Sequence, residues 1–173
     1  MIRGCADGDV ATIDAIINEA AEAYRGVIPA DCWHEPYMVR PELLSEIAAG
    51  VVFSGWEEAG ALVGVMGLQK VSDVTLIRHA YVRLAFQGRG IGSALLASLS
   101  REMTGTLLVG TWAAAEWAIR FYARNGFRLV PPLEKERLLK TYWNIPLRQQ
   151  ENSVVLERQN ESPSSTGQGP RGG

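Results

Sequence analysis

This sequence has few cysteines, few histidines and little net charge. Its 173 residues include two cysteines and two histidines, and 17 basic residues against 19 acidic ones leave a net charge of −2. Two cysteines are too few for a disulfide framework. Cys5, Cys32, His34 and His79 show no metal-ligand spacing, so we expect no metal site. The balanced charge disfavours a nucleic-acid partner, because proteins that bind nucleic acids carry basic patches.

Long apolar runs are missing as well. No segment approaches about 18 consecutive apolar residues, the length that a membrane-spanning helix needs. Residues 1–7 lack the apolar stretch of a signal peptide. We therefore expect no membrane association and, by default, a reducing cytoplasmic setting. Hydrophobic residues still make up 47% of the chain, which is enough for one domain to bury a core.

The apolar pattern predicts one mixed α/β domain over residues 1–158. Residues 10–24 repeat apolar side chains every three or four positions, as an amphipathic helix does. Further helices are expected at 42–48, 91–103, 113–124 and 134–143, and strands at 2–5, 51–56, 61–70, 74–82, 106–112, 127–130 and 153–158. This order predicts an antiparallel first half and parallel crossovers around the strand at 74–82. Residues 159–173 carry no large apolar side chain, and we expect a disordered tail there.

A glycine-rich turn follows the strand at 74–82 and is the main clue to function. It reads Gln87-Gly88-Arg89-Gly90-Ile91-Gly92-Ser93. A strand, a glycine turn and a helix start leave backbone N–H groups free to bind an anion, and glycine lets the backbone approach a phosphate. A P-loop is excluded because the chain has no Gly-x-x-x-x-Gly-Lys-Ser/Thr string. A dinucleotide fingerprint fails because its third glycine and its acidic residue are missing.

Gln87, Gly90 and Gly92 satisfy the pattern Gln-x-x-Gly-x-Gly, and here the chain resembles the GCN5-related N-acetyltransferase (GNAT) superfamily. Residues 118–127, AIRFYARNGF, are similar to a second family signature, A-x-x-F-Y-x-x-x-G-F. The resemblance covers residues 1–158. It implies an α/β fold with a GNAT-like mixed sheet, antiparallel in its N-terminal half, with parallel central strands splayed around acetyl-CoA and helices on both faces. It also implies an acetyl-CoA-dependent N-acetyltransferase that works by direct attack in a ternary complex.

The resemblance further implies which residues hold acetyl-CoA, the co-substrate, and it implies no metal. The end of the strand and the glycine turn would bind it through Tyr81, Val82, Arg83, Gln87, Gly88, Arg89, Gly90, Ile91, Gly92 and Ser93. We expect the two arginines of this set to pair with phosphates. One departure is Ala115, where the family often has an asparagine that contacts the cofactor.

By the same resemblance, Tyr122 gives its proton to the leaving thiolate. The ordinary pKa of tyrosine, about 10, exceeds that of a thiol, about 8.5, so the transfer is feasible. Three alternatives stay open for the base: His79, His34, or no dedicated base at all. His79 is equally a candidate for a buried structural histidine. Regular alternation places Arg78 and His79 on opposite faces of the strand, and a bulge would swap them.

The acceptor is expected where two aromatic-rich regions meet, residues 24–40 and 133–150. Candidate acceptor-binding residues are Tyr24, Trp33, His34, Arg78 and Trp143. The aromatic residues of these regions alternatively close a homodimer interface. The expected acceptor is a primary amine of a small molecule, a peptide N-terminus or a lysine, and the sequence does not choose among them. Two rival functions remain: a non-catalytic acyl-CoA-binding or regulatory module on the same fold, and an acyltransferase that uses another acyl donor or an alcohol acceptor.

Overall fold

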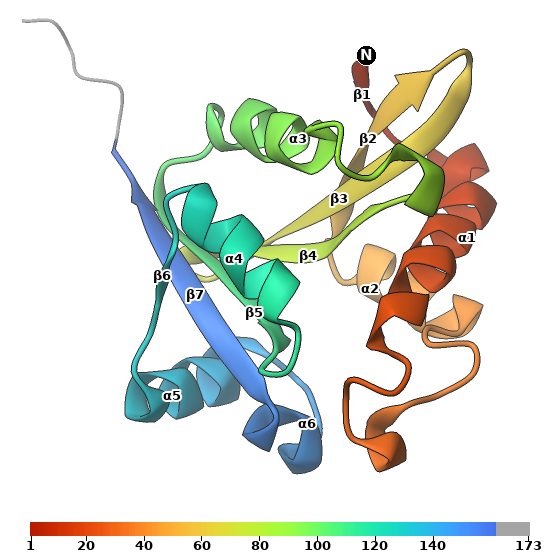
Figure 1. Cartoon of the computed structure of the whole chain (residues 1–173). Helices are drawn as coiled ribbons and strands as arrows, with labels where there is room; N and C mark the ends of the chain where they lie inside the picture. The colour runs from red at the N-terminus through yellow and green to blue at the C-terminus, as the bar shows by residue number, and fades with distance from the viewer. Residues whose placement is uncertain (162–173) are drawn as a thin grey trace, which may run out of the picture.

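A computed structural model of the chain describes residues 1–161. Within them one sheet has the strand order β1-β2-β3-β4-β5-β7-β6 (Figure 1). Only β4 and β5 pair in parallel, and every other neighbouring pair in this sheet is antiparallel. The predicted mixed fold is confirmed, with parallel pairing confined to the centre of the sheet. The strands are β1 (Ile2–Gly4), β2 (Val52–Glu58), β3 (Ala61–Val71), β4 (Val74–Val82), β5 (Gly105–Trp112), β6 (Arg128–Leu129) and β7 (Ser153–Asn160).

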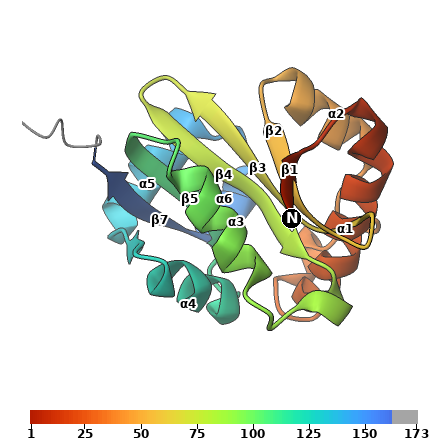
Figure 2. The same cartoon turned by 90° about the horizontal axis from the view of Figure 1, so that it is seen from above.

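Helices cover both faces of the sheet (Figures 1 and 2). On one face, α3 and α4 pack over β3, β4, β5 and β7. On the other face, α1 and α2 cover β2 and β3, while α5 covers β4, β5 and β7. Successive residues of β5 alternate between these layers, because Leu107 and Val109 face α3 and Leu108 faces α5. The helices are α1 (Val10–Ala20), α2 (Arg40–Ala48), α3 (Ile91–Ser100), α4 (Glu116–Arg124), α5 (Pro132–Tyr142) and α6 (Leu147–Glu151).

The first helix shows how directly the apolar pattern sets the packing. Ile13, Ile16, Ile17, Ala20 and Tyr24, the residues that define the predicted stripe, are all buried. After Ala20 the chain tightens into a short 3-10 turn over residues 21–24. This tighter turn ends the helix slightly earlier than the predicted 10–24 and directs the chain toward the aromatic-rich region that follows.

Several predicted boundaries are corrected by the structure. α4 begins at Glu116 instead of 113, and β6 has two residues instead of four. α6 was not predicted at all, because its five residues are too few to show a helical period. β7 runs to Asn160, whose side-chain amide donates to the carbonyl oxygens of Ser100 and Met103 at 2.8 and 3.1 Å. Residues 159 and 160 are therefore part of the sheet. The remainder of the predicted tail, 162–173, lies outside the described residues.

None of the helices in residues 1–161 combines the length and the apolar character that crossing a membrane requires.

The central strands separate along their length. β4 and β5 pair only where residues 74–77 face residues 106–109. Beyond Ile77, β4 stays paired with β3, whereas β5 stays paired with β7 as far as Trp112. The carboxyl ends of the two strands therefore diverge, as the resemblance predicts, and one edge of β4 is left without a strand partner.

A β-bulge lies on β4 where the separation begins. Val65 faces Tyr81 and Gly67 faces Arg78, so two residues of β4 lie opposite one residue of β3. His79 is one of the two and has a φ of +54°, in the left-handed region that non-glycine residues rarely adopt. Gly67 permits the close approach, because a Cβ there would lie 2.9 Å from the carbonyl oxygen of Arg78.

Two substitutions of His79 measure how much this left-handed backbone lowers the free energy of unfolding. His79→Ala and His79→Gly both remove the side chain, but only glycine adopts a φ of +54° without a steric penalty. We expect His79→Gly to be more stable to unfolding than His79→Ala by about 1 kcal/mol, measured by urea denaturation with tryptophan fluorescence. The same pair at Thr75, which lies in regular β4, should show the opposite order. Equal stability of the two His79 variants would contradict the bulge.

Candidate functional site

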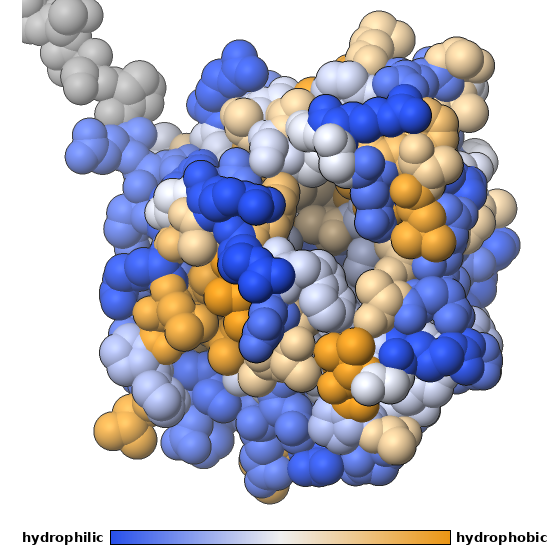
Figure 3. Space-filling model, in the orientation of Figure 1, coloured by the Kyte–Doolittle hydropathy of each residue, from blue (hydrophilic) through white to orange (hydrophobic). Residues whose placement is uncertain are grey.

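The divergence of β4 and β5 opens a cavity of about 910 Å³. A volume of this size suits an organic ligand, because such sites commonly span about 300–1,000 Å³. The cavity extends from the glycine turn to residues 143–149 and is lined by segments that lie far apart in the sequence. The space-filling view shows the hollow near the centre of this face (Figure 3).

The glycine turn forms the anion-binding end of the cavity. Gly88 and Gly90 have φ angles of +78° and +77°, and Gly90 is the left-handed N-cap of α3. A Cβ on either glycine would project into open space, so these positions also keep the approach to the backbone clear. The N–H groups of residues 88–93 have no backbone acceptor within residues 1–161. These amides and the positive end of the helix dipole together favour a phosphate.

The other two motif residues fix the shape of this turn. The Gln87 side-chain amide donates to the carbonyl oxygen of Val82 at 3.0 Å, which ties the turn to the end of β4. A Cβ on Gly92 would lie 3.3 Å from the ring of Phe121, so this glycine lets α3 and α4 pack closely. The spacing Gln-x-x-Gly-x-Gly thus has a structural reason at each of its three positions.

The arginines near the turn are engaged elsewhere. Arg83 pairs with Glu19 at 2.8 Å, and Arg89 lies over the Phe86 ring at 4.9 Å. Neither side chain lines the cavity, so this geometry does not support their predicted pairing with phosphates. Arg124, at the end of α4, does line it and was missed, although it lies inside the second matched motif. The other predicted cofactor residues all line the cavity, namely Tyr81, Val82, Gln87, Gly88, Gly90, Ile91, Gly92 and Ser93.

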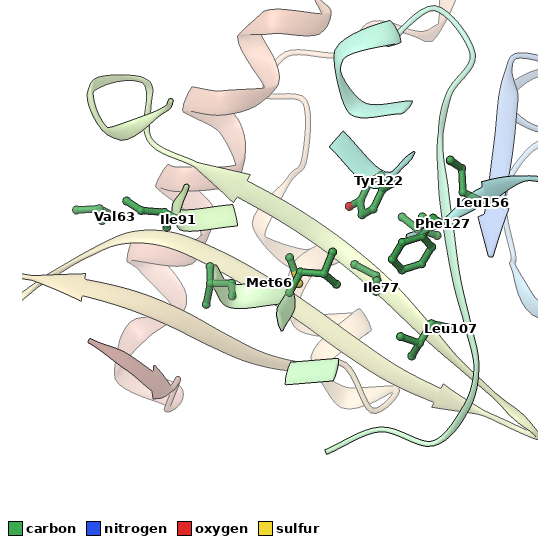
Figure 4. Close-up of a cluster of buried hydrophobic side chains, with 11 residues drawn as sticks. Val63, Met66, Ile77, Ile91, Leu107, Tyr122, Phe127 and Leu156 are labelled. Atoms are coloured by element: carbon green, nitrogen blue, oxygen red, sulfur yellow. The ribbon is translucent and has the colours of Figure 1, made fainter. Parts of the chain in front are cut away.

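Tyr122 lies on α4 and lines the same cavity with 6% of its surface exposed. Its ring packs edge-on against Phe121 and Phe127, with centroid separations of 5.0 and 5.5 Å. Figure 4 shows Tyr122 beside Phe127. Burial raises the pKa of its hydroxyl well above the ordinary value, and the nearby Tyr24 adds to this. Tyr122 therefore keeps its proton at neutral pH, as a general acid must.

His79 also lines the cavity and is bound to Glu46 of α2. The Nε2 atom of His79 contacts one carboxylate oxygen of Glu46, and Arg78 donates to the other. The bulge makes this possible, because neighbouring residues of a regular strand face opposite sides. Burial acts to raise the pKa of Glu46, but the hydrogen bond from His79 and the positive charge of Arg78 lower it, and the resulting pKa lies below its ordinary value. The carboxylate is therefore ionised at neutral pH.

Aromatic side chains gather at the other end of the cavity. The Tyr24 ring lies 5.3 Å from that of Tyr37 and 6.4 Å from that of Tyr81. The hydroxyl of Tyr81 donates to that of Tyr24 at 3.4 Å, and Trp112 Nε1 donates to the Tyr37 hydroxyl at 2.8 Å. Burial raises the pKa of all three tyrosines, so this wall is polar but uncharged at neutral pH.

The structure brings together four of the five predicted acceptor residues. Tyr24, His34, Arg78 and Trp143 line the cavity. Trp33 does not, and it packs against Tyr37 with ring centroids 5.8 Å apart. The predicted homodimer interface stays a prediction.

An ion pair joins the two walls of the aromatic end. Arg148 of α6 donates to Asp31, which lies in the short 3-10 turn Ala30–Cys32, at 2.8 Å. Both residues line the cavity and neither was singled out from the sequence, since 117 residues separate them.

Residues that could chelate a metal do not cluster in this part of the chain. Residues 1–161 contain no group of three or more histidine, cysteine or acidic side chains suited to a metal ion.

Comparisons with known proteins agree with this geometry. The family model described as an acetyltransferase (GNAT) domain matches residues 49–129. The fold is similar to that of the PaiA N-acetyltransferase from Thermoplasma acidophilum in complex with coenzyme A, with a TM-score of 0.70 and 18% identity over 92% of this chain and 98% of that one. Among curated proteins, none matches the sequence significantly.

Two other solved structures extend the likeness. A ribosomal-protein-alanine N-acetyltransferase from Brucella melitensis gives a TM-score of 0.65 and 19% identity over 92% of this chain and 99% of that one. The third is an N-acetylglutamate synthase from Neisseria gonorrhoeae, complexed with coenzyme A and N-acetyl-glutamate. Its TM-score is 0.63 and its identity 24%, over 92% of this chain and 34% of that one.

The likeness to these structures shows the fold, because their identities lie below 25%. The family match adds evidence from the sequence itself, and it spans both the glycine turn and Tyr122. The resemblance to the GNAT superfamily is therefore confirmed, and residues 49–129 match the model of its acetyltransferase domain.

Proposed function

We propose that this protein is an acetyl-CoA-dependent N-acetyltransferase that acetylates a primary amine. The observation that carries the proposal is the single cavity between the diverging ends of β4 and β5, which the glycine turn, Tyr122 and His79 all line. The GNAT family match supports acyl transfer. Two of the similar structures contain coenzyme A, which supports the choice of donor.

The residues present fit the pyrophosphate and pantetheine parts of acetyl-CoA. The amides of residues 88–93 suit its pyrophosphate, and Arg124 supplies a cation on the cavity wall. The free edge of β4 near Val82 offers backbone N–H and C=O groups to the amides of pantetheine. When bound, acetyl-CoA supplies an acetyl group activated as a thioester.

The reaction follows from the groups that line the cavity. The amine nitrogen attacks the carbonyl carbon of the thioester, an N–C bond forms and the C–S bond breaks. His79 accepts the proton that the nitrogen loses, and Tyr122 gives a proton to the departing sulfur. Direct attack in a ternary complex needs no covalent acyl-enzyme, and the aromatic end of the cavity leaves room for the acceptor beside the thioester.

A substitution in the glycine turn tests the cofactor site. Gly90→Ala places a methyl group where the phosphate approaches and strains a φ of +77°. We expect its affinity for coenzyme A to fall about tenfold or more, which corresponds to about 1.4 kcal/mol, measured by calorimetry. Gly60→Ala is the matched control, because Gly60 has a φ of +79° in the β2–β3 turn and does not line the cavity. It should lose similar stability and keep its affinity.

A thermal-shift experiment tests the same site without mutation. Coenzyme A at about 100 times its dissociation constant should stabilise the protein by about 2.7 kcal/mol. A wild-type protein that shows no shift and no binding heat with either coenzyme A or acetyl-CoA would rule out the proposed donor.

A substitution of Tyr122 tests its role as the acid. Tyr122→Phe removes one hydroxyl, so affinity for coenzyme A should be retained while kcat falls about 100-fold. The assay is release of free thiol from acetyl-CoA across a panel of amines, amino acids and peptides. Because burial raises the pKa of Tyr122, wild-type activity should show no loss from its ionisation below about pH 10.

The control for this experiment is Tyr142→Phe, which loses an exposed hydrogen bond to Asp73 and should keep its activity. A non-catalytic acyl-CoA-binding module would behave differently, since its wild type would bind coenzyme A and release no thiol with any acceptor. A wild type that turns over only with another acyl-CoA would instead identify a different donor.

A further inference from the structure

We propose that Glu46 is a positioning residue, which holds His79 in the one tautomer that leaves Nδ1 free to take the proton of the amine. This inference rests on the proposed function, because it assigns Glu46 a part in the same reaction. Glu46 carried no signal in the sequence, since it lies on α2, 33 residues from His79.

The contact between the two side chains fixes where the hydrogen of the imidazole lies. An ionised carboxylate only accepts hydrogen bonds, so the Nε2 atom that contacts Glu46 must carry the hydrogen. In a neutral imidazole the lone pair is then on Nδ1. The second histidine that lines the cavity, His34, is exposed and so lacks a comparable buried setting.

A chain of hydrogen bonds keeps the carboxylate of Glu46 in place. Arg78 binds its other oxygen and also donates to the side chain of Gln69 at 3.1 Å. The Gln69 amide in turn donates to the carbonyl oxygen of Ala49, just after α2, at 3.1 Å. This chain joins α2, β3 and β4, so the carboxylate cannot move without disturbing three elements.

The surroundings hold the imidazole ring on its other sides as well. The ring stacks on Phe53 of β2 with centroids 6.1 Å apart. The side chains of Glu46, Arg78 and His79 are only 14–19% exposed, so water competes weakly for their hydrogen bonds. A histidine whose only task was to fill space would not need a left-handed backbone that turns it toward a buried carboxylate.

His79, Tyr122 and solvent account for every proton that the reaction moves. Nδ1 of His79 accepts the proton that the attacking amine loses, and the resulting imidazolium is stabilised by the Glu46 carboxylate. Tyr122 has meanwhile given its proton to sulfur. Return of the proton from His79 to Tyr122 through solvent restores both residues, so one amine and one thioester yield one amide and one thiol.

The tautomer can be measured without any turnover. The chain has two histidines, so its imidazole ¹⁵N spectrum contains two ring systems, and His34→Gln assigns them. We expect neutral His79 to carry its hydrogen on Nε2 in the wild type. In Glu46→Gln the amide can also donate, so we expect a mixed or reversed tautomer. A wild-type His79 with its hydrogen on Nδ1, or a tautomer unchanged in Glu46→Gln, would overturn the proposal.

Kinetics test whether Glu46 acts through His79. We expect His79→Gln to lower kcat about 100-fold and Glu46→Gln to lower it about 10- to 100-fold. The double variant should be no slower than His79→Gln alone, because Glu46 has nothing left to position. Losses that multiply in the double variant would show that Glu46 acts elsewhere, through Arg78 for example, and would refute the inference. Glu102→Gln is the control, since Glu102 is exposed and lies outside the cavity.

The two experiments separate this inference from the proposed function. A wild type that turns over no amine while His79 holds the expected tautomer would contradict the proposed reaction and leave the Glu46 contact intact. An active enzyme whose His79 tautomer ignores Glu46→Gln would keep the proposed function and refute the positioning role. Measuring the wild-type tautomer needs no variant, so a hydrogen on Nδ1 of His79 there would refute the inference even if a variant fails to fold.

Discussion

The end of the β4–β5 hydrogen-bond ladder after Ile77 and Val109 is the constraint on which the rest of the structure depends. A buried backbone group without a partner costs about 1–3 kcal/mol, so a central strand does not lose its neighbour without consequence. β7 keeps one edge of β5 paired as far as Trp112, and the edge of β4 beyond Ile77 lines the cavity. The gap is therefore built into the sheet.

The bulge at His79 is the second constraint, and both strands contribute to it. β4 supplies the left-handed residue, while β3 supplies Gly67, where a side chain would collide with the carbonyl of Arg78. The bulge turns two adjacent side chains toward the carboxylate of Glu46. A small irregularity of the backbone thus brings two neighbouring polar side chains to the cavity wall.

Local signals in the sequence predicted the parts of the site that local structure determines. The α1 stripe and the glycine turn are each encoded by residues within a few positions of one another, and both were found from spacing alone. The bulge, Glu46 and the partner of Arg83 depend on residues brought together from distant segments. Arg83 is the clearest case, because nothing near it in sequence reveals that it pairs with Glu19, 64 residues earlier.

The ion pair between Asp31 and Arg148 bears on how easily the aromatic end of the cavity opens. It joins the two walls of the aromatic end, yet both side chains are more than half exposed, and exposed pairs of this kind contribute about 1 kcal/mol or less. Thermal motion therefore breaks and remakes it readily, and no strand of the sheet has to move when it does. Opening this end of the cavity therefore requires only that two surface side chains separate, with no rearrangement of the sheet.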